Sequence, residues 1–394
     1  MSDGTLQTLD ITMLDDVGTG ANQLIQLDSN AKIPACSAAA VTNLPSITKS
    51  SSDPTISTNP SGGVGTVFQN TTSGEMYVCT DATAGANVWT NVGAGSGDIR
   101  LAWYGGRAVM GGGYVSGDVD TMDYFAIATP GNATDFGDLT DGRRGSDAVS
   151  NGTRGLWGGG RLALVDTIDY VTIASTGNAI DFGDLTTVTW AVAACSNGIR
   201  GVWGGGMDTT TTSRNVIDYV TIATIGNALD FGDLTEYRRG FASCSNGTRG
   251  IWGGGYRDHS PSGYHNIIDY VTIASTGNAL DFGDLSGQHW SMSAVASVTR
   301  GIFAGGSTSA ATINIIEYVT IATPGNATDF GDMIGVTYGM GGAHNADRGV
   351  FAGGWTSGYI NTIQYITMAS TGNATDFGDL TTARGEQPGG CSGD

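Results

Sequence analysis

The sequence predicts an all-β fold built from repeated units of four strands each. The octet GNAxDFGD occurs six times at intervals of 46 to 51 residues, a period typical of stacked or radial repeats. Within the repeats, a tyrosine always precedes the phenylalanine of the octet by 12 residues, and in five copies an arginine follows it by 18. The chain also contains 64 glycines among 394 residues, as expected of many short strands joined by tight turns. The six asparagines of the octet are Asn132, Asn178, Asn227, Asn278, Asn326 and Asn373.

Composition limits the classes of function. Seventeen basic and 37 acidic residues leave a net charge of -20, which repels polyphosphate, so we expect no nucleic-acid partner. The N-terminus, MSDGTLQTLDITMLDD, has acids where a secretory signal needs a basic start, and no run of 18 apolar residues is present. We therefore expect a protein made in a cytoplasm without membrane insertion. Cys195 and Cys244 occupy the same position in different repeats, so the cysteines are predicted to be small buried thiols rather than disulfide partners.

Residues 1–62 are predicted to be an attachment segment and linker. They contain few aromatic residues and include the Ser/Pro-rich run ITKSSSDPTISTNPSGG. The upstream stretch GTGANQLIQLDSNAKIPACSAAAVTNLPS resembles modules of phage tail fibres, in which three chains wind together. That resemblance implies a homo-oligomer, a trimer, with other virion proteins as partners. An unremarkable flexible arm is the alternative.

Residues 63–394 are predicted to be the repeat domain, which begins with a partial copy. The stretch from 64 to 93 contains three strand-like runs, TVFQN, EMYVCTD and NVWTNV. Tyr77 lies 12 residues before Trp89, and Trp89 lies 18 residues before Arg107. These are the offsets of the full repeats, so the stretch is interpreted as a degenerate seventh copy.

Each full copy is predicted to form four strands. In the fourth copy they are Arg238–Asn246, Arg249–Gly254, Ile267–Ser275 and Ala279–Leu285. The first and last pairs are joined by SNGT and STGN, whose Asn-Gly and Thr-Gly dipeptides accept the positive φ of tight hairpins. A four-stranded antiparallel meander of this length is typical of one blade of a β-propeller.

The repeats resemble kelch repeats. A kelch repeat has an early arginine, an apolar strand ending in Gly-Gly, an acid-tyrosine pair, and an aromatic residue followed by a leucine. The matching residues in the fourth copy are Arg238 or Arg239, Ile251 to Gly254, Asp269 with Tyr270, and Phe282 with Leu285. Phenylalanine stands where kelch repeats have tryptophan, although Trp89 keeps it. The resemblance covers residues 64–394 and implies a kelch-like β-propeller; with the fibre-like N-terminus, it implies a virion structural protein of a tailed phage.

The number of blades follows from how the ring closes. Ala383–Asp394 corresponds to a first strand with nothing after it. We expect it to supply the inner strand of the blade that contains Tyr77 and Trp89, giving seven blades and no free sheet edge. The alternative is a ring of six blades that begins at Ile99, because Glu386 and Pro388 make this segment a poor strand.

The recurring polar residues are predicted to be structural. Asp230 and Asp233 of the octet could bind calcium, but an invariant packing unit is favoured, with Asn227 bonding its own turn and Phe231 between blades. The arginines that open the second strands are expected to donate to these aspartates across blades. No cofactor is predicted.

No catalytic motif is present. The glycine triplets lack a following P-loop lysine, and the four histidines lack metal-ligand spacing. We therefore expect no enzyme activity. A polysaccharide depolymerase is the alternative, since a glycosidase needs only two suitably spaced carboxylates.

The irregular loops carry the predicted binding site. In a four-stranded meander the two tight turns lie on one face, and the other two connections lie on the opposite face. The first set is nearly constant among copies, whereas the second varies in aromatic and polar residues. This pattern predicts a tail fibre or related appendage of the virion whose second face binds a host-surface receptor, a glycan. A purely structural baseplate or head decoration protein, or drift of unselected loops, is the alternative. The predicted receptor-binding residues are Tyr256, His259, Tyr264, His265, Trp290, Trp190, Tyr237, Arg238, Trp355 and Tyr359.

Overall fold

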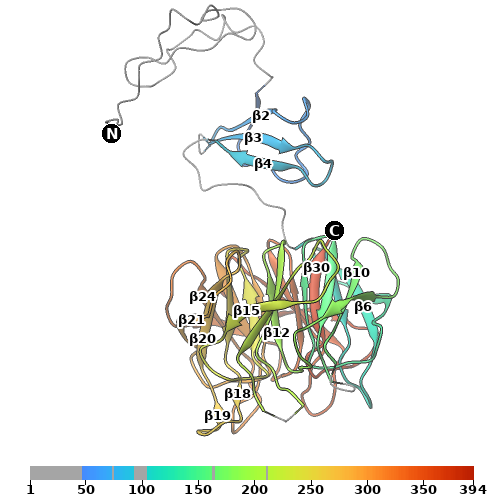
Figure 1. The fold of residues 1–394 in the computed structure, drawn as a ribbon, viewed down its shortest axis with the longest axis vertical. Helices are drawn as coiled ribbons and strands as arrows, with labels where there is room; N and C mark the ends of the chain where they lie inside the picture. The colour runs from blue at the N-terminus through green and yellow to red at the C-terminus, as the bar shows by residue number, and fades with distance from the viewer. Residues whose placement is uncertain (1–46, 73–74, 93–103, 162–164, 210–211) are drawn as a thin grey trace, which may run out of the picture. The chain divides into compact units, whose positions relative to one another are not determined.

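The computed structural model describes residues 47–72, 75–92, 104–161, 165–209 and 212–394 (Figure 1). The chain divides into two compact units, residues 1–101 and 102–394. The sequence placed this division between residues 62 and 63. The described residues are all-β and contain no helix, and hence none of the length and apolarity needed to cross a membrane.

The described part of the first unit is one small four-stranded sheet. It contains β1 (Thr48–Ser50), β2 (Val67–Asn70), β3 (Met76–Asp81) and β4 (Val88–Asn91), and only the β1–β2 pair is parallel. The three strands predicted between 64 and 93 are confirmed. Phe68, Tyr77, Cys79 and Trp89 form its buried cluster. The Trp89 indole donates to the Thr58 carbonyl at 3.2 Å, so residues predicted to be linker belong to this folded unit.

The described residues of the second unit form six four-stranded antiparallel sheets. Sheet 1 contains β30 (Gly389–Gly393), β5 (Arg107–Gly111), β6 (Thr121–Ala126) and β7 (Thr134–Asp138). Sheet 2 contains β8 (Asp147–Ser150), β9 (Arg154–Gly158), β10 (Thr167–Thr172) and β11 (Ile180–Asp184). Sheet 3 contains β12 (Ala193–Ser196), β13 (Arg200–Gly204), β14 (Val216–Thr221) and β15 (Leu229–Asp233). Sheet 4 contains β16 (Ala242–Ser245), β17 (Arg249–Gly253), β20 (Ile267–Thr272) and β21 (Leu280–Asp284). Sheet 5 contains β22 (Ser293–Ala296), β23 (Arg300–Ala304), β24 (Ile315–Thr320) and β25 (Thr328–Asp332), and sheet 6 contains β26 (Gly341–His344), β27 (Arg348–Ala352), β28 (Thr362–Thr367) and β29 (Thr375–Asp379).

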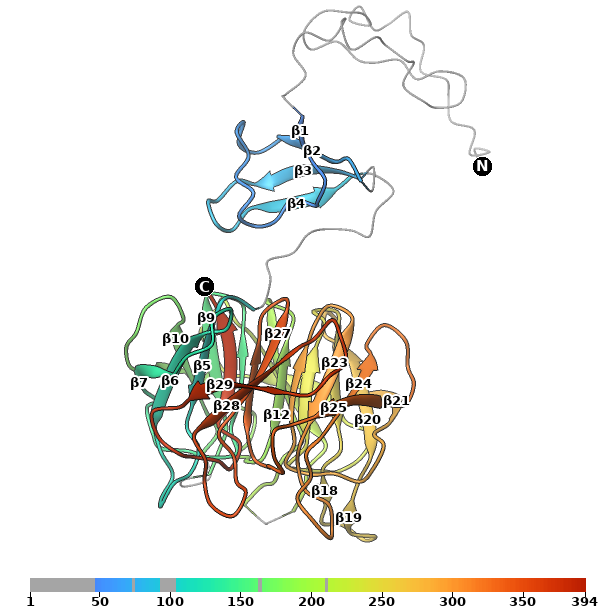
Figure 2. The same ribbon diagram turned by 180° about the vertical axis from the view of Figure 1, so that it is seen from behind.

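The octet joins each sheet to the next. Asn178 Oδ1 of sheet 2 accepts a hydrogen bond from the Asp138 amide of sheet 1 at 3.2 Å. The same bond recurs between every pair of neighbours, and Asn132 with Asp379 joins sheet 6 back to sheet 1 at 3.1 Å. The six innermost strands also contact one another in a closed circuit. This arrangement, visible from opposite sides in Figures 1 and 2, is consistent with a β-propeller.

The glycine of the octet is required by this junction. Gly137 has a φ of +139°, and a Cβ there would lie 2.5 Å from the carbonyl oxygen of Gly177 in the next sheet. Any other side chain would therefore push the neighbouring sheets apart. The octet asparagine acts across this junction, which corrects the expectation that Asn227 bonds its own turn: Asn227 Oδ1 accepts from the Asp184 amide of the preceding sheet.

The arginines that open the second strands also act between sheets. The Arg107 guanidinium donates to the carbonyls of Ile173 and Ala174 at 2.8 and 2.9 Å and lies 4.7 Å from the Tyr124 ring centroid. The predicted inter-sheet donation is confirmed, but the acceptors are backbone carbonyls rather than the octet aspartates. The reason is position: these carbonyls follow the third strand of the next sheet, whereas the octet aspartates lie on the fourth, outermost strand.

The C-terminal strand completes sheet 1. β30 pairs antiparallel with β5, with Cys391 opposite Val109. The segment therefore closes a sheet as predicted, but not the one that contains Tyr77 and Trp89, which belong to the other unit. Its glycines suit this place, because a Cβ on Gly390 would lie 2.3 Å from the carbonyl oxygen of Gly342 in β26.

Candidate functional site

The two variable connections of each sheet lie together at one end of the second unit, here called the loop face. Trp190, which precedes β12, forms a backbone bridge with Met207, which follows β13. Equivalent bridges join Arg239 to Tyr256 and Tyr338 to Trp355. The longest of these connections forms a small hairpin of β18 (Tyr256–Arg257) and β19 (Gly263–Tyr264), which marks the loop face at the end away from the C-terminus in Figures 1 and 2.

A ring of backbone hydrogen bonds supports the loop face. Just before each innermost strand, one residue adopts a φ between 55° and 69°. The amide of this residue donates to the carbonyl of its counterpart in the preceding sheet, and the six bonds measure 2.5 to 3.0 Å. The residues involved are Gly145, Ala191, Gly240, Ser291, Gly339 and the Glu386–Gln387 pair. This ring holds in place the backbone of the residue that precedes each member. These preceding residues are Arg144, Trp190, Arg239, Trp290, Tyr338 and Gly385.

Around this ring, aromatic and arginine side chains form a continuous circuit that we call the collar. It consists of Tyr114, Arg144, Arg161, Trp190, Arg239, Tyr256, Tyr264, Trp290, Tyr338, Trp355 and Tyr359. Each member contacts the next through a ring contact, a guanidinium over a ring, or a backbone hydrogen bond. Arg161 is exposed and the other ten are half-buried, so these ten side chains are held by their neighbours while keeping part of their surface accessible.

One sector of the collar is aromatic. Tyr256 meets Tyr264 with ring centroids 5.2 Å apart, and Tyr264 meets Trp290 at 6.2 Å. Trp290 stacks on Tyr338 at 6.4 Å with an interplanar angle of 23°. Trp355 meets Tyr359 at 4.6 Å, and Tyr359 meets Tyr114 at 5.7 Å. Burial and the nearby Glu386 raise the pKa of Tyr359 to about 12, so this hydroxyl is a neutral donor at physiological pH.

The other sector contains the three collar arginines. The guanidinium carbon of Arg144 lies 4.2 Å from the Tyr114 ring centroid. Those of Arg161 and Arg239 lie 5.0 and 5.9 Å from the Trp190 ring, and Arg239 also lies 5.1 Å from Tyr256. The Arg161 amide donates to the Arg144 carbonyl at 2.9 Å, which connects the sector to the rest of the circuit.

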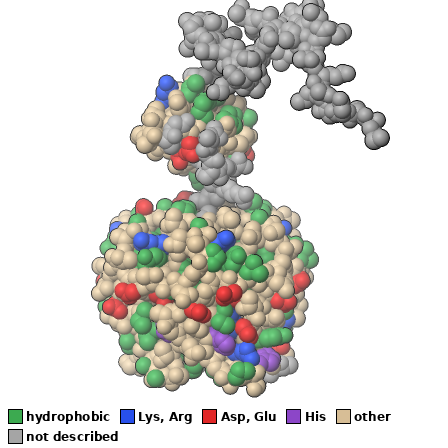
Figure 3. Space-filling model, turned by 90° about the vertical axis from the view of Figure 1, so that its left-hand side faces the viewer, with side chains coloured by type: hydrophobic (Ala, Val, Ile, Leu, Met, Phe, Trp, Pro, Cys, Tyr) green, Lys and Arg blue, Asp and Glu red, His purple; other side chains and the backbone are tan. Residues whose placement is uncertain are grey.

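Most of the predicted receptor-binding residues lie at the loop face. The collar contains Trp190, Tyr256, Tyr264, Trp290, Trp355 and Tyr359. Tyr237 and His259 lie against each other, with ring centroids 4.8 Å apart, and Tyr237 is exposed. His265 is half-buried, and burial together with the nearby Arg238 lowers the pKa of its imidazole. Figure 3 shows histidine and basic side chains gathered near the end of this unit that carries β18 and β19.

Arg238 is the exception and corrects the prediction. Its side chain is fully buried, donates to the carbonyls of Gly254 and Ile267 at 2.7 and 2.8 Å, and pairs with Asp269 at 2.6 Å. A bound molecule cannot reach it. Arg143–Asp169 and Arg384–Asp123 form the same buried pair in other sheets. The neighbouring Arg239 carries the accessible charge instead.

Sequence reasoning missed five members of the collar, although a signal was present. Arg144, Arg239 and Tyr338 lie 10 residues before the arginine that opens the next second strand, as do Trp190 and Trp290. Tyr114 and Arg161 lie seven residues after such an arginine, as do Tyr256 and Trp355. The two offsets from an invariant residue would have found all five missed members.

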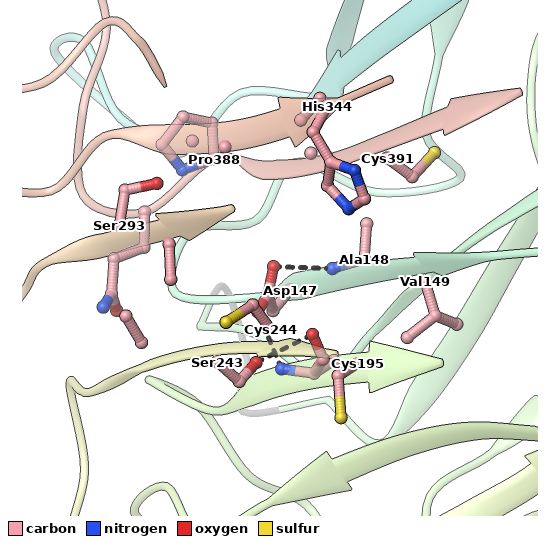
Figure 4. A pocket seen from close by; sticks show the side chains of 18 of the residues that line it. Asp147, Ala148, Val149, Cys195, Ser243, Cys244, Ser293, His344, Pro388 and Cys391 are labelled. Atoms are coloured by element: carbon pink, nitrogen blue, oxygen red, sulfur yellow. Dashed lines mark hydrogen bonds between the residues drawn. The ribbon is translucent and has the colours of Figure 1, made fainter. Parts of the chain in front are cut away.

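The innermost strands enclose a cavity of about 90 Å³. Figure 4 shows Asp147 and His344, from β8 and β26, facing the same space, with Cys195, Cys244 and Cys391 around it. The Asp147 carboxylate accepts from the amides of Ala148 and Ala194 at 2.8 and 2.7 Å. Burial raises its pKa to about 7, raises the pKa of Cys244 to about 12 and lowers that of His344 to about 4. At neutral pH the thiols are therefore protonated and the imidazole is neutral, which suits packing rather than nucleophilic chemistry.

Among the residues that the structure describes, no three His, Cys, Asp or Glu side chains come together in a group that could hold a metal ion, the octet carboxylates included. No family of known proteins matches the chain, and no curated protein sequence matches it either. The collar and its charges are therefore the features from which function is inferred.

Proposed function

We propose that this chain is a virion fibre protein of a tailed phage, and that residues 104–394 form a six-bladed β-propeller whose loop face binds a glycan on the host surface. The observation that supports this most strongly is the collar. Aromatic and arginine side chains run unbroken around one end of the unit, whereas the opposite end is built from tight turns that repeat with little change.

The chemistry of the collar suits a saccharide. Indole and phenol rings offer flat apolar surface on which a sugar ring can lie, and their polar atoms, with nearby guanidinium groups, can fix its orientation. Because each collar side chain is already packed against its neighbours, little rotamer freedom is lost on binding. Trp290 is central to the aromatic sector, since its ring lies 6.2 Å from Tyr264 and 6.4 Å from Tyr338.

A substitution in the aromatic sector tests this proposal. Trp290→Ala should weaken adsorption to host cells by roughly tenfold or more, because truncating a central binding aromatic typically costs about 2 kcal/mol or more. The readout is adsorption of the purified full-length protein to host cells. The melting temperature, measured in parallel, should remain close to that of the wild type.

Asn246→Ala is the matched control on the opposite face. Asn246 Oδ1 accepts from the amides of Thr248 and Arg249 at 3.1 and 2.9 Å in a tight turn. This change should lower the melting temperature and leave adsorption of the folded protein unchanged. If adsorption survives replacement of Trp290, Tyr264 and Tyr338 together, the binding face is assigned wrongly.

Incubation with glycans extracted from the host envelope separates binding from cleavage. The proposal expects the protein to bind without releasing new reducing ends. Release of reducing ends would instead identify a depolymerase. A protein that neither binds nor cleaves would have a purely structural role in the virion.

A further inference from the structure

The accessible arginines of the second unit are concentrated on the loop face. The six arginines that open second strands donate to backbone carbonyls of the next sheet. Arg143, Arg238 and Arg384 form buried ion pairs, and Arg214 lies close enough to the buried Asp218 to oppose the rise in pKa that burial causes in that acid. The remaining arginines of the described part of this unit are Arg144, Arg161, Arg239 and Arg257, all in loop-face connections of sheets 2 and 4.

Three of these four arginines have an acidic partner. Arg144 pairs with Asp118 at 3.3 Å, Arg239 with Asp258 at 3.0 Å and Arg257 with Glu236 at 2.5 Å. Arg161 forms no ion pair with any residue that the structure describes. Burial raises the pKa of Asp118, the partner of Arg144, and the nearby charges of Arg144 and Arg161 both oppose that rise. Arg161 is therefore the one of these four arginines whose guanidinium lies near an acid without pairing with it.

Arg161 is also placed beside a surface that suits a sugar. Its guanidinium carbon lies 5.0 Å from the Trp190 ring centroid, and that of Arg239 lies 5.9 Å from the same ring. Trp190 forms a backbone bridge with Met207, and the Arg161 amide is bound to Arg144, so the backbone of both residues is fixed. Two guanidinium groups thus flank one indole ring whose surface is partly accessible.

We infer that Arg161, Trp190 and Arg239 form a subsite for an anionic sugar, with a carboxylate or phosphate group held by the guanidinium of Arg161 and the sugar ring against Trp190. This inference rests on the proposed function and narrows it to acidic glycans. A planar guanidinium binds either anion through two parallel hydrogen bonds. The protein carries a net charge of -20, so an anionic chain is repelled from most of its surface and attracted only where positive charge is uncompensated.

The test uses full-length protein and three oligosaccharide probes. They are an oligosaccharide of glucuronic acid, the same oligosaccharide with its carboxylates reduced to alcohols, and an oligosaccharide carrying phosphate monoesters. Wild-type protein should bind an acidic probe at least about tenfold more tightly than the neutral one, and this preference should fall as salt is added. Whichever acidic probe binds better identifies the anion as carboxylate or phosphate.

Arg161→Gln should weaken binding of the acidic probe at least about tenfold more than binding of the neutral probe, and so remove this preference. Lys49→Gln is the matched control, because it removes one exposed positive charge from the other unit and should alter neither. Arg161→Lys keeps the charge but cannot form the two parallel hydrogen bonds of a guanidinium, so it should recover only part of the preference. Partial recovery would also show that the fold tolerates substitution at this position.

The outcomes distinguish failure of the anionic subsite from failure of the proposed glycan-binding function. Equal binding of neutral and acidic probes, with no effect of Arg161→Gln, would overturn the anionic subsite while leaving glycan binding intact. Failure of all three probes to bind would also overturn it, whereas the effect of Trp290→Ala on adsorption to host cells would still decide the proposed function. Loss of binding to every probe in Arg161→Gln, with an unchanged melting temperature, would assign Arg161 to general saccharide contact rather than to an anion.

Discussion

Repetition lets each residue be compared with its counterparts in the same molecule. The buried pair beneath the loop face is Arg with Asp in three sheets, with His289 and Glu317 replacing it in sheet 5. In sheet 6 both positions are uncharged, with Thr337 and Gln364. Sheet 3 differs, because Thr189 stands at the position of the cation. There burial raises the pKa of Asp218, and hydrogen bonds from Thr186 and the nearby charge of Arg214 oppose that rise. Charge compensation thus explains the choice of arginine in sheets 1, 2 and 4.

Asp147 gives a prediction at the same scale. Its pKa is about 7 in the folded chain, mainly because burial disfavours the charged carboxylate, against an ordinary value of 3.8. The folded state therefore binds this proton more tightly than the unfolded state, so the group's contribution to stability falls as pH rises from about 4 to about 7. The counterparts of Asp147 are Ala193, Ala242, Ser293, Gly341 and Gly389.

Asp147→Ser, which adopts a counterpart's residue, should reduce the decline in melting temperature between pH 4 and pH 7. The quantity to compare is the difference in melting temperature between variant and wild type at each pH in this range, because the other acids contribute equally to both proteins. If the two melting curves shift in parallel with pH, Asp147 titrates at its ordinary value and the buried carboxylate has been misjudged.

At the scale of the strand, the second, third and fourth strands of each sheet could be predicted from the sequence, and the first, innermost strand less well. The second and third strands, such as Arg249–Gly253 and Ile267–Thr272, combine alternating apolar residues with a fixed spacing to an invariant arginine or tyrosine. The segment before β30 contains Glu386 and Pro388 and looked unsuited to a strand. The residue pattern of a single strand does not reveal how closely the backbones of neighbouring strands approach. Where the innermost strands lie close together, that approach selects glycine over residues with a high strand propensity.

Gly390→Ala tests this reading of β30. The added Cβ would lie 2.3 Å from the carbonyl oxygen of Gly342, which is too close for a backbone atom to accommodate without movement. We expect a clear fall in melting temperature and exposure of the β5 edge, seen as aggregation on heating. Gly358→Ala is the control, since a Cβ at Gly358 has open space around it. Equal stability of the two variants would mean that β30 does not pair with β5 in solution.

At the scale of the whole molecule, the C-terminal strand does not pair with the sheet of Tyr77 and Trp89 as expected, and the reason is physical. The spacing of Tyr77, Trp89 and Arg107 equals that of a full repeat, but spacing records the length of a hairpin and not the strand with which it pairs. β3 pairs with β4 on one side and with β2 on the other in a separate sheet. In contrast, the division into a constant and a variable face was visible from the sequence, because it depends only on which connections vary between copies.

Oligomeric state is the prediction for the whole chain. Residues 1–46 lie outside the described residues, and the fibre-like composition of this region is the ground for proposing a trimer. A segment so poor in apolar residues buries too little surface alone to offset roughly 1 to 2 kcal/mol of backbone entropy per residue. Light scattering of the full-length protein should therefore give a mass of about three times 40.3 kDa. A mass equal to that of one chain would contradict the proposal.

The pairing of β30 with β5 has a mechanical consequence. Because the C-terminal strand lies on one side of β5 and β6 on the other, the chain enters the second unit through an interior strand, although β5 comes first in sequence. A pull transmitted along the chain from the N-terminal side meets two ladders of hydrogen bonds lying along the direction of force. These bonds must be sheared together rather than unzipped one by one, so the second unit should resist tension applied along β5.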